Sequence, residues 1–188
     1  MTNLPPSHYL DIGVLGEDIV AQWLQSRGWI ILHRRWRCRW GEIDLVAKLD
    51  LQLGGAEGAE GAEEAGEEKT PSDPSALFSP LAPRPSPLLA FVEVKTRRRN
   101  NWDEGGLLAI TPKKQAKLWQ AAQYFLAAYP DLAEYTCRFD VALVSYQGNQ
   151  SPDSSITSLS SLTIRIGQPI SFAGYQLVLQ EYLPSAFD

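Results

Sequence analysis

"WGEIDLVAKLD", residues 40–50, and "LLAFVEVKTRRR", residues 88–99, are the two stretches that decide the fold. Both predict strands, and the second is apolar enough for the middle of a sheet. Each nevertheless carries acidic residues. Because side chains alternate between the two faces of a strand, Glu42 and Asp44 share one face of the first strand, and Glu93 and Lys95 share one face of the second. The question is what these charges do inside a sheet.

Pairing the two strands with their acidic faces aligned would make Asp44 and Glu93 neighbours, with Lys95 about 7 Å further along. Two close, buried carboxylates repel unless one is protonated, a cation neutralises them, or a divalent metal lies between them. Carboxylate oxygens suit Mg²⁺ (or Mn²⁺), which activates water for attack on phosphorus, and Lys95 would stabilise the negative transition state. An ordinary Glu93–Lys95 ion pair at a sheet edge is the alternative.

The rest of the chain predicts an α/β domain with a mixed sheet flanked by helices. Apolar residues at helical spacing, ending at Gly28, predict the first helix, and Thr111 followed by Pro112 predicts the start of the second. In chain order we expect a helix over residues 15–28, a strand over 29–40, the two strands quoted above, a helix over 113–130, and strands over 138–146 and 161–167.

Length and composition indicate a single domain over residues 1–188 with one core, since 44% of the residues are hydrophobic. Residues 52–87 form an acidic, then Pro/Ser-rich segment that cannot bury enough apolar surface to fold. We expect this segment to be a disordered insertion in the connection between two antiparallel strands, next to the carboxylates. The closure penalty of such a connection grows slowly with length, so the sheet tolerates it.

The sequence also predicts a cytoplasmic protein with no membrane partner. No run of 18 apolar residues is present, and the first residues lack the plan of a signal peptide. Two cysteines and two histidines are too few for a disulfide framework or a cysteine zinc site.

Charge is unevenly distributed along the chain. The net charge is −5, and residues 54–87 alone account for it, with seven acidic and two basic residues. Clustered cations elsewhere predict a local positive face for nucleic acid, although solvated surface is the alternative. Trp36, Trp40 and Trp102 flank these runs and are candidate stacking contacts. The candidate phosphate contacts are Arg35, Arg37, Arg97, Arg98, Arg99, Lys113 and Lys114.

Six blocks of the sequence, taken in order, resemble the bacterial YraN-like family of proposed endonucleases. That family is similar in fold to restriction endonucleases and to archaeal Holliday junction resolvases. The resemblance implies a restriction-endonuclease-like three-layer domain that hydrolyses phosphodiester bonds of DNA, with branched or distorted DNA as the favoured substrate. The blocks are "LGEDIVAQWLQSRGWIIL", "WGEIDLVA", "LAFVEVKTR", "AITPKKQAKLWQAAQYFL", "RFDVALV" and "YLPSAFD".

The resemblance also implies roles for single residues. The metal-binding aspartate of this superfold falls on Asp44, its glutamate on Glu93, its lysine on Lys95, and a further metal-binding glutamate on Glu17 of the first helix. Glu17 borders the apolar stripe of that helix and can lean toward the sheet, while a solvated or capping role is the alternative. Gln115 resembles a polar helper position in related nucleases.

Two other classes of function remain open from the sequence. The first is a nucleic-acid-binding module that keeps the fold and the basic surface but lacks turnover, acting in DNA repair or processing. The second is a protein–protein scaffold in which the carboxylates only form ion pairs. If the substrate is a symmetric junction, resolving it needs two active sites, and a homodimer would supply them.

Overall fold

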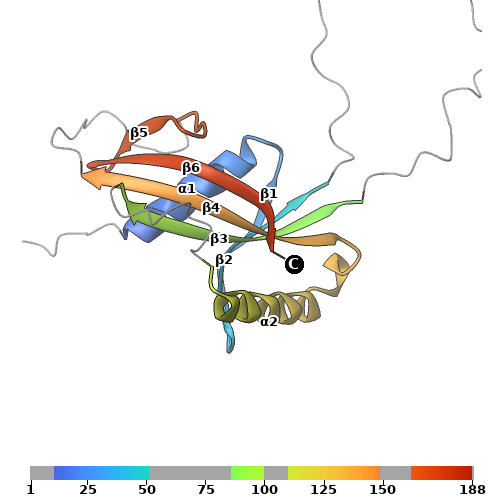
Figure 1. The fold of residues 1–188 in the computed structure, drawn as a ribbon. Helices are drawn as coiled ribbons and strands as arrows, with labels where there is room; N and C mark the ends of the chain where they lie inside the picture. Colours follow the sequence, from blue (N-terminus) through green and yellow to red (C-terminus); the bar gives the residue numbers. More distant parts are fainter. Residues whose placement is uncertain (1–10, 51–85, 100–109, 149–161, 188) are drawn as a thin grey trace, which may run out of the picture.

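The structure is a computed structural model that describes residues 11–50, 86–99, 110–148 and 162–187. Six strands form one sheet, with two α-helices packed against it (Figure 1). A single turn of 3₁₀ helix follows the second α-helix at Pro130–Leu132. The elements are α1 Ile12–Gln25, β1 Ile30–Cys38, β2 Gly41–Leu49, β3 Leu88–Arg98, α2 Pro112–Ala128, β4 Thr136–Gly148, β5 Pro169–Phe172 and β6 Tyr175–Phe187.

The sheet is mixed, as predicted, with strand order β1-β2-β3-β4-β6-β5. β1, β2 and β3 are antiparallel, β3 and β4 are parallel, and β6 runs antiparallel to both β4 and β5. The predicted strand over residues 161–167 is wrong. A turn occupies its end, where Gly167 has a φ of +77°, and the strand begins only at Pro169.

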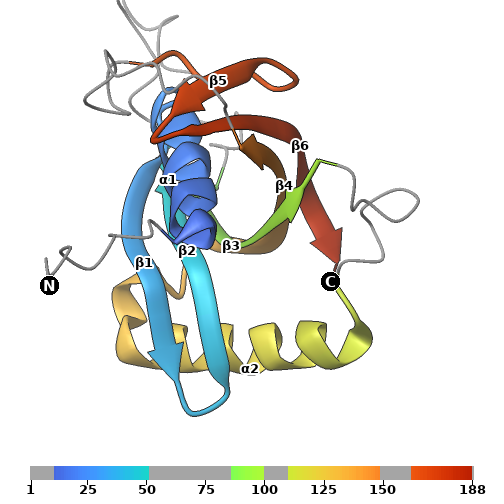
Figure 2. The ribbon, with the colours of Figure 1, turned by 90° about the vertical axis from the view of Figure 1, so that its left-hand side faces the viewer.

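The two helices cover opposite faces of the sheet and give three layers (Figure 2). On one face, α1 packs against side chains of the central strands such as Leu45 and Val92. On the other face, Phe125 of α2 packs against Val46 and Phe91. Consecutive residues of β2 therefore enter different cores, which explains the apolar run of Leu45, Val46 and Ala47. Within the described ranges, no helix is long and apolar enough to cross a membrane.

Both helices start with a capped turn. Asp11 accepts a hydrogen bond from the Gly13 N–H at the start of α1, and Thr111 caps α2 immediately before Pro112, as predicted. α1 approaches β3 very closely at Gly16, where an added Cβ would lie 2.0 Å from Thr96 Oγ1. Only glycine fits at this contact, and it brings the next residue, Glu17, against the sheet.

The ends of the long connection between β2 and β3 lie at one end of the sheet, where Leu49 pairs with Leu88. The connection itself, residues 51–85, lies outside the described residues, so its predicted disorder is not tested. These two ends, however, do not lie next to the carboxylates, where the connection was predicted. Leu49 is five residues from Asp44, roughly 17 Å along the strand. The reason is strand direction, since the chain leaves β2 at the end away from Asp44.

Candidate active site

The site is built where β2 and β3 part. Leu45 and Val92 form the last pair of the β2–β3 ladder. One residue beyond, the carboxylate of Asp44 accepts a hydrogen bond from the Val94 N–H at 2.7 Å, taking the place of a backbone partner. The same register puts Asp44 opposite Glu93. The structure therefore brings the two predicted carboxylates together, as the alternation of side chains indicated.

Glu93 is the most enclosed group of the site, with only 3% of its side chain exposed. Its Oε1 accepts a hydrogen bond from Lys95 Nζ at 2.5 Å. Its Oε2 lies 3.0 Å from Lys114 Nζ of α2, but without hydrogen-bond geometry, so this buried oxygen has no hydrogen-bond partner among the described residues. The Glu93–Lys95 ion pair thus exists, but it lies on β3, a central strand, and not at a sheet edge.

The carboxyl of Asp44 has an unusually high pKa. Burial is the main cause, the negative charge of Glu93 adds to it, and Glu17 contributes less. The Val94 N–H and Lys114 act in the opposite direction, and the balance raises the pKa to about 7. The pair therefore holds a proton over much of the acidic range, which is one of the ways two adjacent carboxylates can coexist.

Glu17 enters the site from α1. It is 8% exposed, and the guanidinium of Arg35 holds it with two hydrogen bonds of 2.8 and 2.9 Å. Because Glu17 is buried, and because Asp11 caps the helix, the solvated and capping alternatives for Glu17 are wrong. Arg35 has a φ of +50°, a left-handed conformation that costs a non-glycine residue about 1–2 kcal/mol. The Glu17 carboxylate also raises the pKa of Arg35 above its ordinary value.

Two carboxylates of this site fit a magnesium ion better than three do. In the part of the chain that the structure describes, no group of three or more His, Cys, Asp or Glu side chains is arranged to hold a metal. Glu17 is occupied by Arg35. Asp44 and Glu93 remain, with a buried oxygen of Glu93 that has no hydrogen-bond partner among the described residues and an Asp44 carboxyl of raised pKa. Mg²⁺ commonly takes one or two carboxylates and fills its other positions with water and phosphate oxygens.

Comparison with known proteins gives the family of the chain. Residues 16–144 match the model of "Uncharacterised protein family UPF0102". A UPF0102 protein of Nostoc sp. is 46% identical over 180 residues, covering 96% of this chain and 96% of the relative. A UPF0102 protein of Trichodesmium erythraeum is 44% identical over 188 residues, covering 96% of this chain and 91% of the relative. The chain belongs to the UPF0102 family.

The region that matches the UPF0102 model contains the whole candidate site. Asp44, Glu93 and Lys95 lie within residues 16–144, and so do the two groups that approach from the helices, Glu17 and Lys114. β5, β6 and the last residues of β4 lie beyond the match. The matched region therefore contains β1, β2, β3, α2, all but the first turn of α1, and most of β4.

The predicted nucleic-acid contacts of this UPF0102 protein divide into two groups. Arg35 and Lys114 contact Glu17 and Glu93, and Arg37 lies 3.1 Å from Glu42. Arg37 is itself 70% exposed. The remaining four are exposed and have no carboxylate partner among the described residues, and one of them, Arg99, donates to Gln147 at 3.3 Å. These four are Arg97, Arg98, Arg99 and Lys113.

Some contacts of the site could not be foreseen from the strands alone. Lys114 was expected to contact phosphate, and the structure places it on Glu93 instead. Gln115 donates to the backbone oxygen of Ile110, at 3.4 Å, at the start of α2. The one available signal was the position of Lys114 and Gln115 in the first turn of a helix that follows β3 after a short connection.

Proposed function

We propose that this UPF0102 protein is a metal-dependent endonuclease with a restriction-endonuclease-like fold, which hydrolyses phosphodiester bonds of branched or distorted DNA in the cytoplasm. The observation that carries the proposal is the pairing of Asp44 with Glu93 where β2 and β3 part. Asp44 has a pKa of about 7, and a buried oxygen of Glu93, 3.0 Å from Lys114 Nζ, has no hydrogen-bond partner in the described part of the chain. Carboxylates perturbed in this way are typical of functional sites.

Asp44 and Glu93 are the residues that would hold Mg²⁺ or Mn²⁺. When bound, such an ion supplies a Lewis acid for the phosphoryl oxygen and a water of lowered pKa. Lys95 already lies at Glu93 and is 17% exposed, so its ammonium can stabilise a phosphate that approaches from solvent. Lys114, which is 34% exposed, can do the same from α2.

Glu17 is the third proposed metal-binding carboxylate, and its use requires a change of partner. Arg35 now holds it, and the Arg35 side chain is 35% exposed. A DNA phosphate would offer the guanidinium a second anionic partner of the geometry that arginine binds well. In this proposal substrate binding draws Arg35 away and makes Glu17 available to the site.

A non-catalytic nucleic-acid-binding module is the second candidate. One observation favours it: the carboxylates of Glu17 and Glu93 are already contacted by Arg35, Lys95 and Lys114. In the described ranges, no three acidic side chains are arranged around a metal position. A protein of this kind would bind DNA through its exposed cations without cutting it.

A cleavage assay separates the two candidates. End-labelled duplex, single strand, flap and four-way junction are incubated with Mg²⁺, Mn²⁺ or EDTA. The wild type is compared with Asp44→Asn and Lys95→Ala. Under the endonuclease proposal the wild type cuts in a metal-dependent way and both variants cut at least 100-fold more slowly. Removing one group that stabilises charge in the transition state lowers the rate by about 100-fold or more.

Absence of cutting on every substrate, together with salt-sensitive binding by all three proteins, would overturn the enzyme and support the binding module. Binding indifferent to salt would overturn both, because phosphate contacts release counterions. Sedimentation with and without a four-way junction tests the homodimer that we propose for symmetric cleavage.

A further inference from the structure

The four arginines between Ile30 and Trp40 do not have equivalent partners. Arg39, at the turn between β1 and β2, has no carboxylate partner among the described residues. Its guanidinium lies instead 5.1 Å from the ring centre of Trp40 and 4.8 Å from that of Tyr124 in α2. The other three are neutralised within the protein: Arg34 by Asp18, Arg35 by Glu17 and Arg37 by Glu42.

The two rings around Arg39 are unusually open to solvent. Trp40 is 38% exposed and Tyr124 is 39% exposed, which is high for such large apolar side chains. Figure 2 shows why, since the β1–β2 hairpin crosses α2 and its tip projects beyond the helix. Exposed aromatic faces next to an uncompensated guanidinium are what unstacked bases and their phosphates bind.

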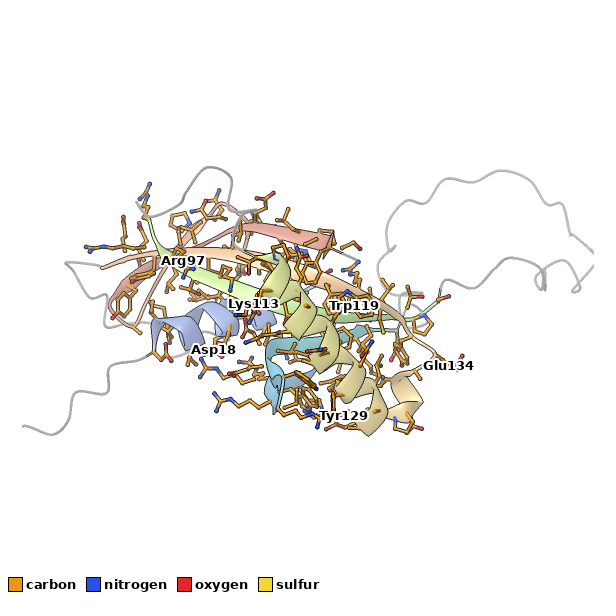
Figure 3. All side chains as sticks on the ribbon, turned by 60° about the horizontal axis from the view of Figure 1, so that its bottom comes forward. Asp18, Arg97, Lys113, Trp119, Tyr129 and Glu134 are labelled. Atoms are coloured by element: carbon orange, nitrogen blue, oxygen red, sulfur yellow. The ribbon has the colours of Figure 1, made fainter. Side chains whose placement is uncertain are left out.

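The outer face of α2 continues this surface toward the carboxylates. Lys113, Lys117 and Tyr124 are spaced by four and seven residues, so they lie on one side of the helix. The two lysines are exposed and make no ion pair within the described part of the chain. At 1.5 Å per residue the stripe from Lys113 to Tyr124 is about 16 Å long. Figure 3 shows Lys113 at the N-terminal end of α2. The neighbouring Lys114 contacts Glu93 at this end of the helix.

We propose that this stripe, consisting of Lys113, Lys117, Tyr124, Arg39 and Trp40, binds single-stranded nucleic acid. The lysines and Arg39 contact phosphates, and an unstacked base lies on the exposed ring of Trp40 or Tyr124. A duplex would not use these rings, because its bases are stacked on one another. The position of the cut along the strand rests on the proposed function: because the stripe leads away from the carboxylates, the stacked base lies several nucleotides from the cut.

Binding of a labelled 15-nucleotide oligothymidylate, followed by fluorescence anisotropy in EDTA, tests the surface without any need for cleavage. Trp40→Ala should weaken binding roughly 10-fold or more, and Trp40→Phe should restore much of the loss, because stacking needs only an aromatic face. Lys117→Gln should reduce the dependence of log K on log salt by about 0.7.

Arg39→Gln and Arg37→Gln form a matched pair, since both remove one positive charge from the same hairpin. Arg39→Gln should weaken oligothymidylate binding several-fold, and Arg37→Gln, whose charge is already neutralised by Glu42, less than about 2-fold. Equal losses in this pair, or unchanged binding by Trp40→Ala, would overturn the inference. So would binding of a blunt duplex as tight as that of the single strand.

The results of the single-strand binding test and of the cleavage assay can be told apart. If no substrate is cut while the Trp40 and Arg39 variants lose single-strand binding, the stripe stands and the enzyme fails. If metal-dependent cutting occurs and neither variant changes binding, the enzyme stands and the stripe fails. If both hold, an abasic nucleotide at the position of the stacked base, several nucleotides from the cut, should mimic Trp40→Ala.

Discussion

The sheet contains two buried carboxylate sites that differ in how well they are satisfied. Asp140 of β4 is completely buried, and its two oxygens accept hydrogen bonds from Arg138 at 3.0 Å, Tyr182 at 2.6 Å and the Ser185 N–H at 2.9 Å. Asp44 accepts one hydrogen bond, from the Val94 N–H, and faces another carboxylate. In the first site Arg138 and two further hydrogen bonds compensate the carboxylate. In the second, Lys95 and Lys114 compensate Glu93, whereas Asp44 forms no ion pair within the described residues and stays uncompensated.

The difference separates an acidic residue that holds the fold together from one that is available for chemistry. Asp140 joins β4 to the end of β6, and removing it leaves Arg138 without its partner. The Asp44 carboxyl has a raised pKa because it is buried and lies beside Glu93, so its ionised form destabilises the folded chain. A protein keeps such a group against its own stability mainly where the group has another task.

The sharpest way to test this comparison is the pH dependence of stability. The folded chain binds the proton of Asp44 more tightly than the unfolded chain does, since the pKa rises from 3.8 to about 7. The free energy of unfolding should therefore fall as pH increases from about 4 to 7, by up to about 4 kcal/mol at 1.36 kcal/mol per unit, less any solvent screening. Urea denaturation of wild type and Asp44→Asn across this range measures the effect as the difference between the two curves. If the free energies of unfolding of the two proteins changed with pH in parallel, the prediction would be wrong.

The same substitution at the compensated site should destabilise the protein. Asp140→Asn leaves Arg138 without a counter-charge, and one amide oxygen cannot serve all three donors. We expect a loss on the order of 3 kcal/mol in the free energy of unfolding. Asp44→Asn, which keeps an acceptor for Val94 and removes the repulsion, should lose nothing at pH 8. Thermal and urea unfolding of the two variants side by side give the measurement, and equal losses would break the comparison.

Divalent metal should stabilise the folded chain by binding at the uncompensated site, Asp44 and Glu93, and not at Asp140. At pH 8, Mg²⁺ or Mn²⁺ at 100 times its dissociation constant should raise the free energy of unfolding by about 2.7 kcal/mol. The increase should shrink at pH 5, where Asp44 holds its proton, and should disappear in Asp44→Asn. Thermal shifts in MnCl₂ and in matched ionic strength of NaCl provide the test. An equal shift in both salts would mean that the ion acts only by screening.

The smallest expected effect concerns a neighbouring cation. Lys114 lowers the pKa of Asp44 from a distance, and it is the weakest of the influences on that carboxyl. Lys114→Gln should therefore raise the Asp44 pKa further, by less than about one unit. A ¹³C titration of the Asp44 carboxyl measures the change, with Lys113→Gln as the control, since Lys113 is exposed on the outer face of the helix. A lower Asp44 pKa in Lys114→Gln would contradict the role of Lys114 in favouring the ionised carboxylate.

The β2–β3 core of the site could be predicted from the sequence because it depends on two simple rules. Alternation along a strand placed Glu93 and Lys95 on one face, and an antiparallel pairing placed Asp44 beside Glu93. Apolar periodicity gave both helices, although α1 begins three residues before the predicted start, at the Asp11 cap. The family match adds that these elements lie within the region that matches the UPF0102 model, residues 16–144.

What the sequence could not give depends on geometry between elements. The Arg35 contact with Glu17 needs a left-handed backbone at a residue that rarely adopts it. Lys114 reaches Glu93 only because of how α2 is rotated against the sheet. β6 was not predicted because "YQLVLQEYLPSAF", residues 175–187, lacks strict alternation and contains Pro184.

The paired ends of the β2–β3 connection make it a natural place for protein engineering. Lys48 and Tyr135 hold Asp50 at 2.8 Å each, and the Thr136 N–H donates to Pro87 at 2.9 Å, so both ends are fixed to the sheet. The cost of closing a connection rises by only about 0.6 kcal/mol per doubling of its length. Residues 51–86 could therefore be exchanged for a short turn or a fluorescent reporter domain without moving Asp44.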